Sequence, residues 1–179
     1  MKKTVLTFGI ISGVIISVLM SITTVFADRI GFDRAVIVGY TSMLMAFLLV
    51  FFGIRSYREN VGGGEISFGR AFTVGILITL ITCLFYVVSW EIIYYNFLTD
   101  FADKYANHVI EKARASGATP DQLAKQREEL KGMKAMLDKP LLSAAIIFIS
   151  EPLPVGLVMT LVSALILRRK RRVGAEVPV

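Results

Sequence analysis

Four long apolar blocks, separated by polar segments, constrain this chain more than any other feature. Of its residues, 55% are hydrophobic and only 19% are charged, whereas about a quarter of residues are charged in most soluble domains. A helix needs about 20 largely apolar residues to cross ~30 Å of hydrocarbon. The blocks at residues 5–26, 35–54, 71–97 and 141–167 meet this requirement. The sequence therefore predicts an all-α, polytopic membrane protein with four transmembrane helices.

The first block also has features of a secretory signal. Lys2 and Lys3 precede it, and Val25-Phe26-Ala27 offers a small-residue cleavage site. Its apolar run, however, exceeds the roughly 7–15 residues of a typical signal core. Small residues recur in it at every fourth position, the spacing that lets membrane helices approach closely. We therefore expect a retained span that packs on another helix through Gly9, Gly13, Ser17 and Ser21.

The basic residues indicate the orientation through their placement. With cytoplasmic termini, the inside segments hold Lys2, Lys3, Arg55, Arg58, Arg70 and the basic run 168–172, and the outside segments hold an equal number of Lys and Arg. The inside charges adjoin the spans, whereas most of the outside ones lie in a segment rich in acids. Basic residues next to span ends favour the cytoplasmic side. We therefore predict cytoplasmic termini. The net charge of +6 does not indicate nucleic-acid binding, because the basic run 168–172 directly follows an apolar block, as a cytoplasmic anchor does.

The polar segment 98–140 is too long to be a bare connection and predicts two helices. Phe101, Tyr105 and Val109 recur every fourth residue, so the third span is expected to continue outward as an amphipathic helix that ends at Gly117. Thr119-Pro120-Asp121-Gln122 has the pattern of a capping box, and an apolar face follows at Leu123, Leu130, Met133 and Leu137. The sequence predicts an extracytoplasmic helical hairpin. It is either a cap that orients the third and fourth spans or a docking site for a partner.

A glycine triplet, Gly62-Gly63-Gly64, lies between the second and third blocks. A phosphate-binding loop would require a preceding strand and a following Lys-Ser or Lys-Thr, and this chain has neither there. We predict a turn, with Ser67 as the N-cap of the third span.

Two carboxylates lie within apolar blocks, where ionisable residues are costly and indicate function. At ~1.5 Å per residue, Glu91 lies roughly 31 Å beyond Arg70, and Glu151 lies roughly 25 Å before Arg168. Both residues should therefore lie in the outer part of the bilayer, within reach of each other if their helices are neighbours. Glu91 also reads as an interfacial charge, beside the aromatic residues Trp90, Tyr94 and Tyr95.

Pro152 and Pro154 follow Glu151 closely. Because proline lacks an N–H and disfavours helical geometry in the residue before it, the fourth span should kink or break there. Broken helices beside an acid build ion or substrate sites in many secondary transporters. The alternative is a structural kink whose freed backbone groups are satisfied by neighbouring helices.

The remaining reactive side chains support no enzyme class. His108 is the single histidine and lies in the segment 98–140, so no transition-metal site is expected. Cys83 lies in an apolar block without a second thiol or a nearby base. We expect no catalytic residue, no metal and no cofactor.

Several stretches along the chain carry a family resemblance. They are Gly53-Ile54-Arg55-Ser56-Tyr57-Arg58, Ile66-Ser67-Phe68-Gly69-Arg70-Ala71, Tyr94-Tyr95, Asp100-Phe101-Ala102-Asp103-Lys104-Tyr105, Glu151-Pro152-Leu153-Pro154-Val155-Gly156-Leu157 and Ser163-Ala164-Leu165-Ile166-Leu167 with the basic tail. On these residues the chain resembles a family of small bacterial inner-membrane proteins catalogued as domain of unknown function 4199. The resemblance implies a bacterial inner-membrane location and a four-span fold, and it brings no activity.

These features together favour a non-enzymatic inner-membrane protein that acts as an accessory or interaction subunit. It would form a homo-oligomer or bind a partner in a membrane complex through the hairpin. The alternative is a small transporter or channel component that uses Glu91 and Glu151 near the broken fourth span. An intramembrane enzyme or a lipid-handling protein is a third, weaker hypothesis.

Overall fold

The computed structural model describes residues 1–169, most of which lie in helices. The helices are α1 (Lys2–Val25), α2 (Ala27–Ile30), α3 (Phe32–Asn60), α4 (Phe68–Phe97), α5 (Phe101–Ala115), α6 (Pro120–Leu137), α7 (Pro140–Ser150) and α8 (Pro152–Leu167). Four candidate spans are long and apolar enough to cross a membrane: α1, α3, α4, and α7 together with α8. The predicted all-α, four-span fold is confirmed. Residues 170–172 of the basic run lie outside the described residues.

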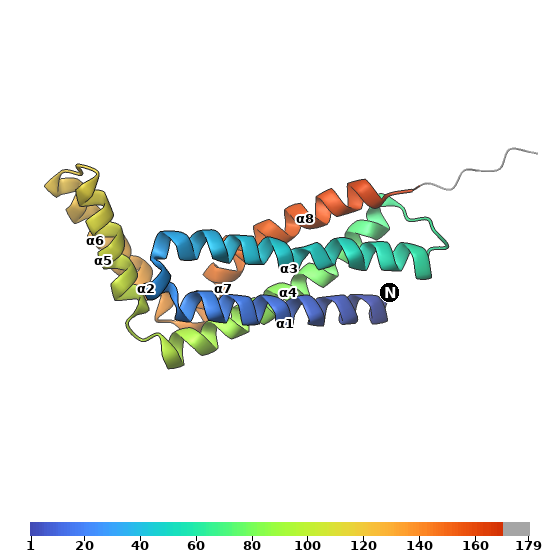
Figure 1. Ribbon diagram of the computed structural model, residues 1–179, viewed down its shortest axis with the longest axis horizontal. Coiled ribbons are helices and arrows are strands. Elements are labelled where there is room, and N and C mark those ends of the chain that lie inside the picture. Colours follow the sequence, from blue (N-terminus) through green and yellow to red (C-terminus); the bar gives the residue numbers. More distant parts are fainter. Residues whose placement is uncertain (170–179) are drawn as a thin grey trace, which may run out of the picture.

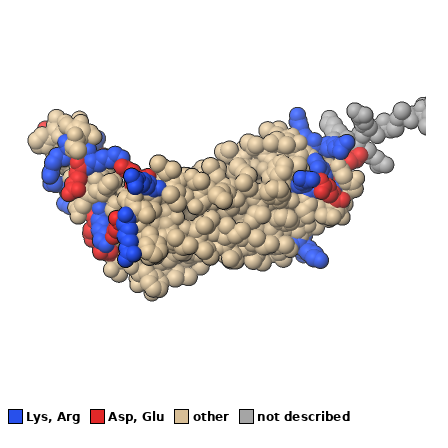
Figure 2. Space-filling view, viewed as in Figure 1, with Lys and Arg blue, Asp and Glu red and all other residues tan. Residues whose placement is uncertain are grey.

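The spans lie side by side in an elongated bundle (Figure 1). The N-terminus, the α3–α4 connection and the end of α8 share one end of the bundle, here called the termini end. The short helix α2 and the α5–α6 pair lie at the opposite end. On the face shown in Figure 2, charged side chains gather at both ends and leave an uncharged belt between them. This distribution is the one that a bilayer requires of a spanning protein.

Helix α4 is at the centre of the packing and contacts α1, α3, α7 and α8. In the most apolar 18-residue stretch of α4, half of the residues are buried, whereas a third or fewer are buried in the corresponding stretch of each other span. Glycines allow the closest approaches, as expected where small residues let helix backbones meet. A Cβ atom built at Gly156 of α8 would lie 2.5 Å from Cγ2 of Thr79 in α4. Beside this contact, the hydroxyls of Thr79 and Thr160 are 2.9 Å apart.

The third span does not continue outward as predicted. Helix α4 ends at Phe97, and a short break precedes α5. Asn96 turns its side-chain amide back to the carbonyl of Ile92, and Thr99 and Asp100 follow, residue types that compete with helical hydrogen bonding. The apolar periodicity from Phe101 onward therefore belongs to a separate helix.

The other local signals are present where the sequence predicts them. Thr119 and Gln122 form a reciprocal capping box at the start of α6. The Ser67 hydroxyl accepts a hydrogen bond from the backbone N–H of Arg70 and caps α4. Gly117, Gly63 and Gly64 all have positive φ angles, which glycine adopts without steric cost.

The end of the fourth span is tied to the start of the third. Ile66 and Arg169 exchange two backbone hydrogen bonds, of 3.2 and 2.9 Å, in an isolated antiparallel bridge. Arg58 donates to the carbonyl of Leu167 nearby. The termini end of α8 is therefore fixed to α3 and to the loop before α4.

Candidate functional site: a cavity at the break in the fourth span

The fourth span is interrupted at Glu151. Helix α7 ends at Ser150, and α8 begins at Pro152. Pro152 is buried, whereas Pro154 is exposed. Because neither proline has an N–H, the carbonyls of Phe148 and Ser150 lose the donor that a continuous helix would supply four residues on. The break therefore places a carboxylate and freed backbone carbonyls at one point of the span.

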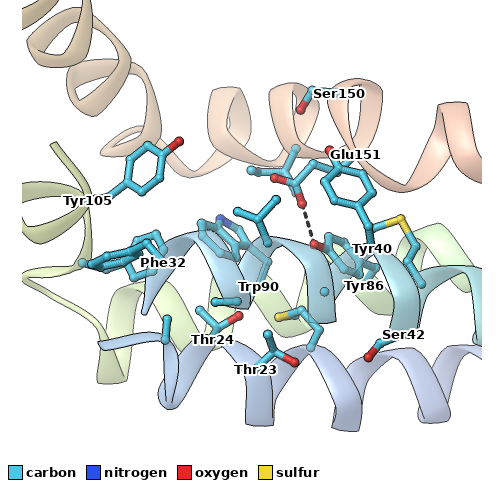
Figure 3. A pocket seen from close by; sticks show the side chains of 18 of the residues that line it. Thr23, Thr24, Phe32, Tyr40, Ser42, Tyr86, Trp90, Tyr105, Ser150 and Glu151 are labelled. Atoms are coloured by element: carbon cyan, nitrogen blue, oxygen red, sulfur yellow. Dashed lines mark hydrogen bonds between the residues drawn. The ribbon is translucent and has the colours of Figure 1, made fainter. Parts of the chain in front are cut away.

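A cavity of about 320 Å³ adjoins this break. Its wall takes residues from α1, α3, α4 and α7, and α5 and α6 cover one side of it (Figure 3). Aliphatic and aromatic side chains make up most of the lining. The polar lining residues are Thr23, Thr24, Tyr40, Ser42, Tyr86, Tyr105, Ser150 and Glu151. We call this space the Glu151 cavity.

Glu151 is the one carboxylate among the described residues that line the cavity, and this lining includes no Lys, Arg or His. Tyr86 of α4 donates its hydroxyl to Oε2 of Glu151 at 2.5 Å (Figure 3). The other carboxylate oxygen has no protein hydrogen-bond partner within the described part of the chain. One oxygen of the acid thus remains available to a ligand.

Trp90 lies one helical turn beyond Tyr86 and also lines the cavity. Its side chain is only 7% exposed, and its indole N–H finds no acceptor in the described chain. One face of the ring stacks on Tyr94, with centroids 5.5 Å apart. In Figure 3 the nitrogen edge faces the space between Tyr105 and Glu151. A buried donor without an acceptor is costly, and this N–H lies in the wall of the cavity.

Helices α5 and α6 form a roof over the cavity through Phe101, Tyr105, Met133 and Leu137. Phe32 at the start of α3 anchors this roof, because its ring lies 5.9 Å from that of Phe101 and 5.8 Å from that of Tyr105. The roof is therefore attached to the spans by an aromatic cluster.

Ion pairs and hydrogen bonds add to the attachment of the roof. Lys104 pairs with Asp28 at 2.6 Å, and Lys112 pairs with Asp33 at 2.7 Å. Hydrogen bonds to Asp28 and Asp100 raise the pKa of Lys104 above its ordinary value. The Tyr95 hydroxyl donates to the carbonyl of Leu137 at the end of α6. The contacts of Lys104 with Asp28, Lys112 with Asp33 and Tyr95 with Leu137 join the roof to α2, α3 and α4.

The cavity is least enclosed between α3 and α7. Helix α3 packs along α8 and has no comparable contact with α7. Tyr40 of α3 and Ser150 of α7 both line the cavity and are exposed. In a bilayer this side would face lipid at the depth of the break.

Residues 7–169 match the model of a family described as "Protein of unknown function (DUF4199)". This chain belongs to the DUF4199 family. No curated protein and no solved structure matches it. Every residue of the cavity lining in this DUF4199 chain lies inside the matched region. The site is therefore built from the part of the chain that carries the family match.

The structure does not bring Glu91 to the cavity. Its carboxylate accepts a hydrogen bond from Ser143 of α7 at 2.7 Å, and it is absent from the cavity lining. Glu91 lies five residues beyond Tyr86 on α4, roughly 7.5 Å along the axis at ~1.5 Å per residue. The two carboxylates of this DUF4199 chain therefore bind separate partners at different points of the α4 interface with the fourth span.

The four small residues of α1 lie on or near its contact with α4. A Cβ atom at Gly9 would lie 2.9 Å from Ile81, and one at Gly13 would lie 2.5 Å from Phe85. Ser17 donates to the carbonyls of Gly13 and Phe85. Ser21 donates to the carbonyl of Ser17. Gly9, Gly13 and Ser17 contact α4, and none of the four residues lines the cavity.

Sequence reasoning missed Tyr86 and interpreted Trp90 as part of an interfacial belt. Both side chains are buried inside the bundle, as is Tyr94. The spacing of these three aromatics, one every fourth residue, puts them on one face of α4. Within a span, such an aromatic stripe is a signal that the helix turns this face toward protein.

Proposed function

We propose that this DUF4199 chain is a non-enzymatic membrane protein that holds a small molecule in the Glu151 cavity and acts as an accessory subunit. The observation that carries the proposal is the carboxylate at the break of a span, in the wall of a cavity of about 320 Å³. Ligand pockets begin at roughly 300 Å³ and combine an apolar lining with a few polar groups. An acid within a span is costly to keep, which favours a functional role.

Filling the cavity tests this proposal. Gly39 lines it, and a Cβ atom there meets nothing within 4 Å, so Gly39→Leu should occupy the cavity without a clash. Gly69→Leu is the matched control, because Gly69 is another helical glycine with open space, outside the lining. After gentle purification in native lipid, native mass spectrometry should detect a bound small molecule on the wild type and the control, and none on Gly39→Leu. The proposal would be contradicted if the wild type and both variants bound the small molecule equally, or if none of the three proteins carried one.

The location proposed is the bacterial inner membrane, with cytoplasmic termini. The basic residues of the termini end support it, because they adjoin the spans and few acids accompany them. A Cys83→Ala background allows a labelling test. The cells are treated so that the outer membrane is permeable and the inner membrane stays sealed. A membrane-impermeant maleimide should then label Lys125→Cys in α6 and not Val61→Cys in the α3–α4 loop. The reverse labelling pattern would show that the termini lie on the extracytoplasmic side and would contradict the proposed orientation.

The accessory role would use the outer surface of α6, where Met136 is 49% exposed and does not line the cavity. This surface is available to a second copy or to another membrane protein. Met136→Asp should release a partner that co-purifies with the wild type and leave the bound small molecule in place. An unchanged set of co-purifying proteins would count against docking on α6.

A second candidate function is transport, favoured by the proline break beside Glu151. In this case Glu151→Gln should abolish substrate flux in reconstituted vesicles while the fold is retained. Glu91→Gln tests whether the second carboxylate takes part. Wild-type flux in both variants would eliminate this candidate.

A further inference from the structure

The charges around Glu151 indicate what kind of molecule the cavity accepts. A carboxylate in a low-dielectric site is stable only when it is protonated or paired with a cation. The titratable groups that line the cavity with it are Tyr40 from α3, Tyr86 from α4 and Tyr105 from α5, and the lining residues of α1, α6 and α7 add none in the described chain. None of these neighbours supplies a positive charge. The counter-charge must therefore be a proton or come from the ligand.

Aromatic rings surround the same space. Phe32, Tyr40, Tyr86, Trp90, Phe101 and Tyr105 all line the cavity. Aromatic side chains attract organic cations through the negative faces of their rings, and the attraction is strongest where water is excluded. An anionic ligand would find no Lys, Arg or His among the described residues that line the cavity.

We propose that the ligand of the Glu151 cavity is an organic cation with an apolar body, which replaces a proton on Glu151. This inference rests on the proposed function, namely that the cavity holds a small molecule. A volume of about 320 Å³ accommodates a single ring system with its charged group. The open side between α3 and α7 lets a lipophilic cation enter from the bilayer.

The exchange is balanced in charge and in protons. In the free protein Glu151 carries one proton and is neutral. When the cation binds, the proton leaves to solvent, and the carboxylate pairs with the ligand while the Tyr86 hydroxyl continues to donate to Oε2. The cavity is thus neutral in both states. Binding therefore releases one proton per cation and tightens as the pH rises.

Trp90 gives a direct readout, because it is the single tryptophan of the chain and lines the cavity. The probes are phenyltrimethylammonium and tert-butylbenzene, which have the same shape and differ in charge. In lipid nanodiscs, phenyltrimethylammonium should change the Trp90 fluorescence saturably, and tert-butylbenzene should bind at least about tenfold more weakly. In the range where Glu151 is protonated, the apparent affinity for the cation should rise up to about tenfold per pH unit.

The variants isolate the carboxylate. Glu151→Gln should weaken cation binding by about tenfold or more, because a buried ion pair loses one partner. Its affinity should also no longer depend on pH. Glu91→Gln is the matched control, since Glu91 lies outside the lining, and it should bind within about twofold of the wild type. The shape-matched probes and the wild-type pH profile remain valid tests even if Glu151→Gln folds poorly.

Two outcomes separate this inference from the proposed function. If tert-butylbenzene binds as tightly as the cation, and Gly39→Leu blocks both probes, the cavity is a ligand site and the cation proposal is overturned. If neither probe binds and the purified wild type carries no small molecule, both proposals fall. Cation binding without pH dependence or proton release would overturn the exchange with Glu151.

Discussion

Gly156 of α8 has no room for even one added methyl group. A Cβ atom there would lie 2.5 Å from Thr79 and 2.7 Å from Phe47. Both neighbours belong to the buried centre of the bundle, so neither can move aside without disturbing other contacts. Gly132 of α6 is the opposite case, because a Cβ atom there meets nothing within 4 Å.

These two glycines predict opposite effects of one substitution. Gly156→Ala should lower the free energy of unfolding by about 1–3 kcal/mol, the usual cost of overpacking. Gly132→Ala should raise the stability of α6 by up to about 1 kcal/mol, because alanine favours a helix interior over glycine. Unfolding in mixed micelles measures the first, and amide hydrogen exchange in α6 measures the second. A shift of the same sign in both variants would contradict the packing described.

Single residues of the site were predictable only in part. Glu151 and its two prolines stand out, because an acid and a pair of imino acids within an apolar block each carry a physical cost. Trp90 and Tyr86 do not stand out, because aromatics suit a lipid interface as well as a protein interior. Their role depends on which face α4 turns toward α7, and this is decided by packing between segments distant in sequence.

At the scale of elements, the division of the fourth span into α7 and α8 shapes the site. Restoring the N–H groups with Pro152→Ala and Pro154→Ala would let the freed carbonyls find helical donors. We expect the span to become more nearly continuous, and α7 to approach α3 and narrow the cavity. The Trp90 fluorescence change with phenyltrimethylammonium should then be lost or weakened at least about tenfold. Binding at wild-type affinity would show that the break is not needed for the cavity.

The attachment of the roof provides another test among the elements. Aromatic pairs contribute about 0.5–1.5 kcal/mol each beyond area burial, whereas exposed ion pairs contribute about 0.2–1 kcal/mol. Phe32→Ala removes contacts with both Phe101 and Tyr105 and should increase amide exchange in α5 markedly. Lys112→Ala, which removes the ion pair with Asp33, should have a smaller effect. A larger effect of Lys112→Ala would reverse the ranking.

The helices were largely predictable because their signals are local. Apolar length defines the spans, and Thr119 and Gln122 define the start of α6 within four residues. The junction of α4 and α5 was not predictable from periodicity, because the apolar positions after Phe101 are compatible with either one helix or two. The break lies among the polar residues Asn96, Thr99 and Asp100, which favour two helices.

Across the whole molecule, the bridge between Ile66 and Arg169 joins segments about one hundred residues apart. Residues that exchange both backbone hydrogen bonds in an antiparallel pair have Cα atoms about 5.5 Å apart, within the range of a disulfide. In a Cys83→Ala background, Ile66→Cys with Arg169→Cys should therefore cross-link on oxidation. The oxidised form should be about 2–4 kcal/mol more stable than the reduced form of the same variant. Failure to cross-link would contradict this pairing.

The same bridge determines which half of the fourth span is held at the termini end. Helix α8 is fastened at Arg169 and again at Thr160, so it belongs to one frame with α4. Helix α7 lies beyond the joint at Glu151 and is linked to α6 at its other end. The break at Glu151 thus divides the fourth span into α8, which is fixed to α3 and α4, and α7, which packs on α6 and is joined to Glu91 of α4 through Ser143. A molecule in the cavity would therefore contact both α7 and α6, on the side of the break that the bridge does not hold.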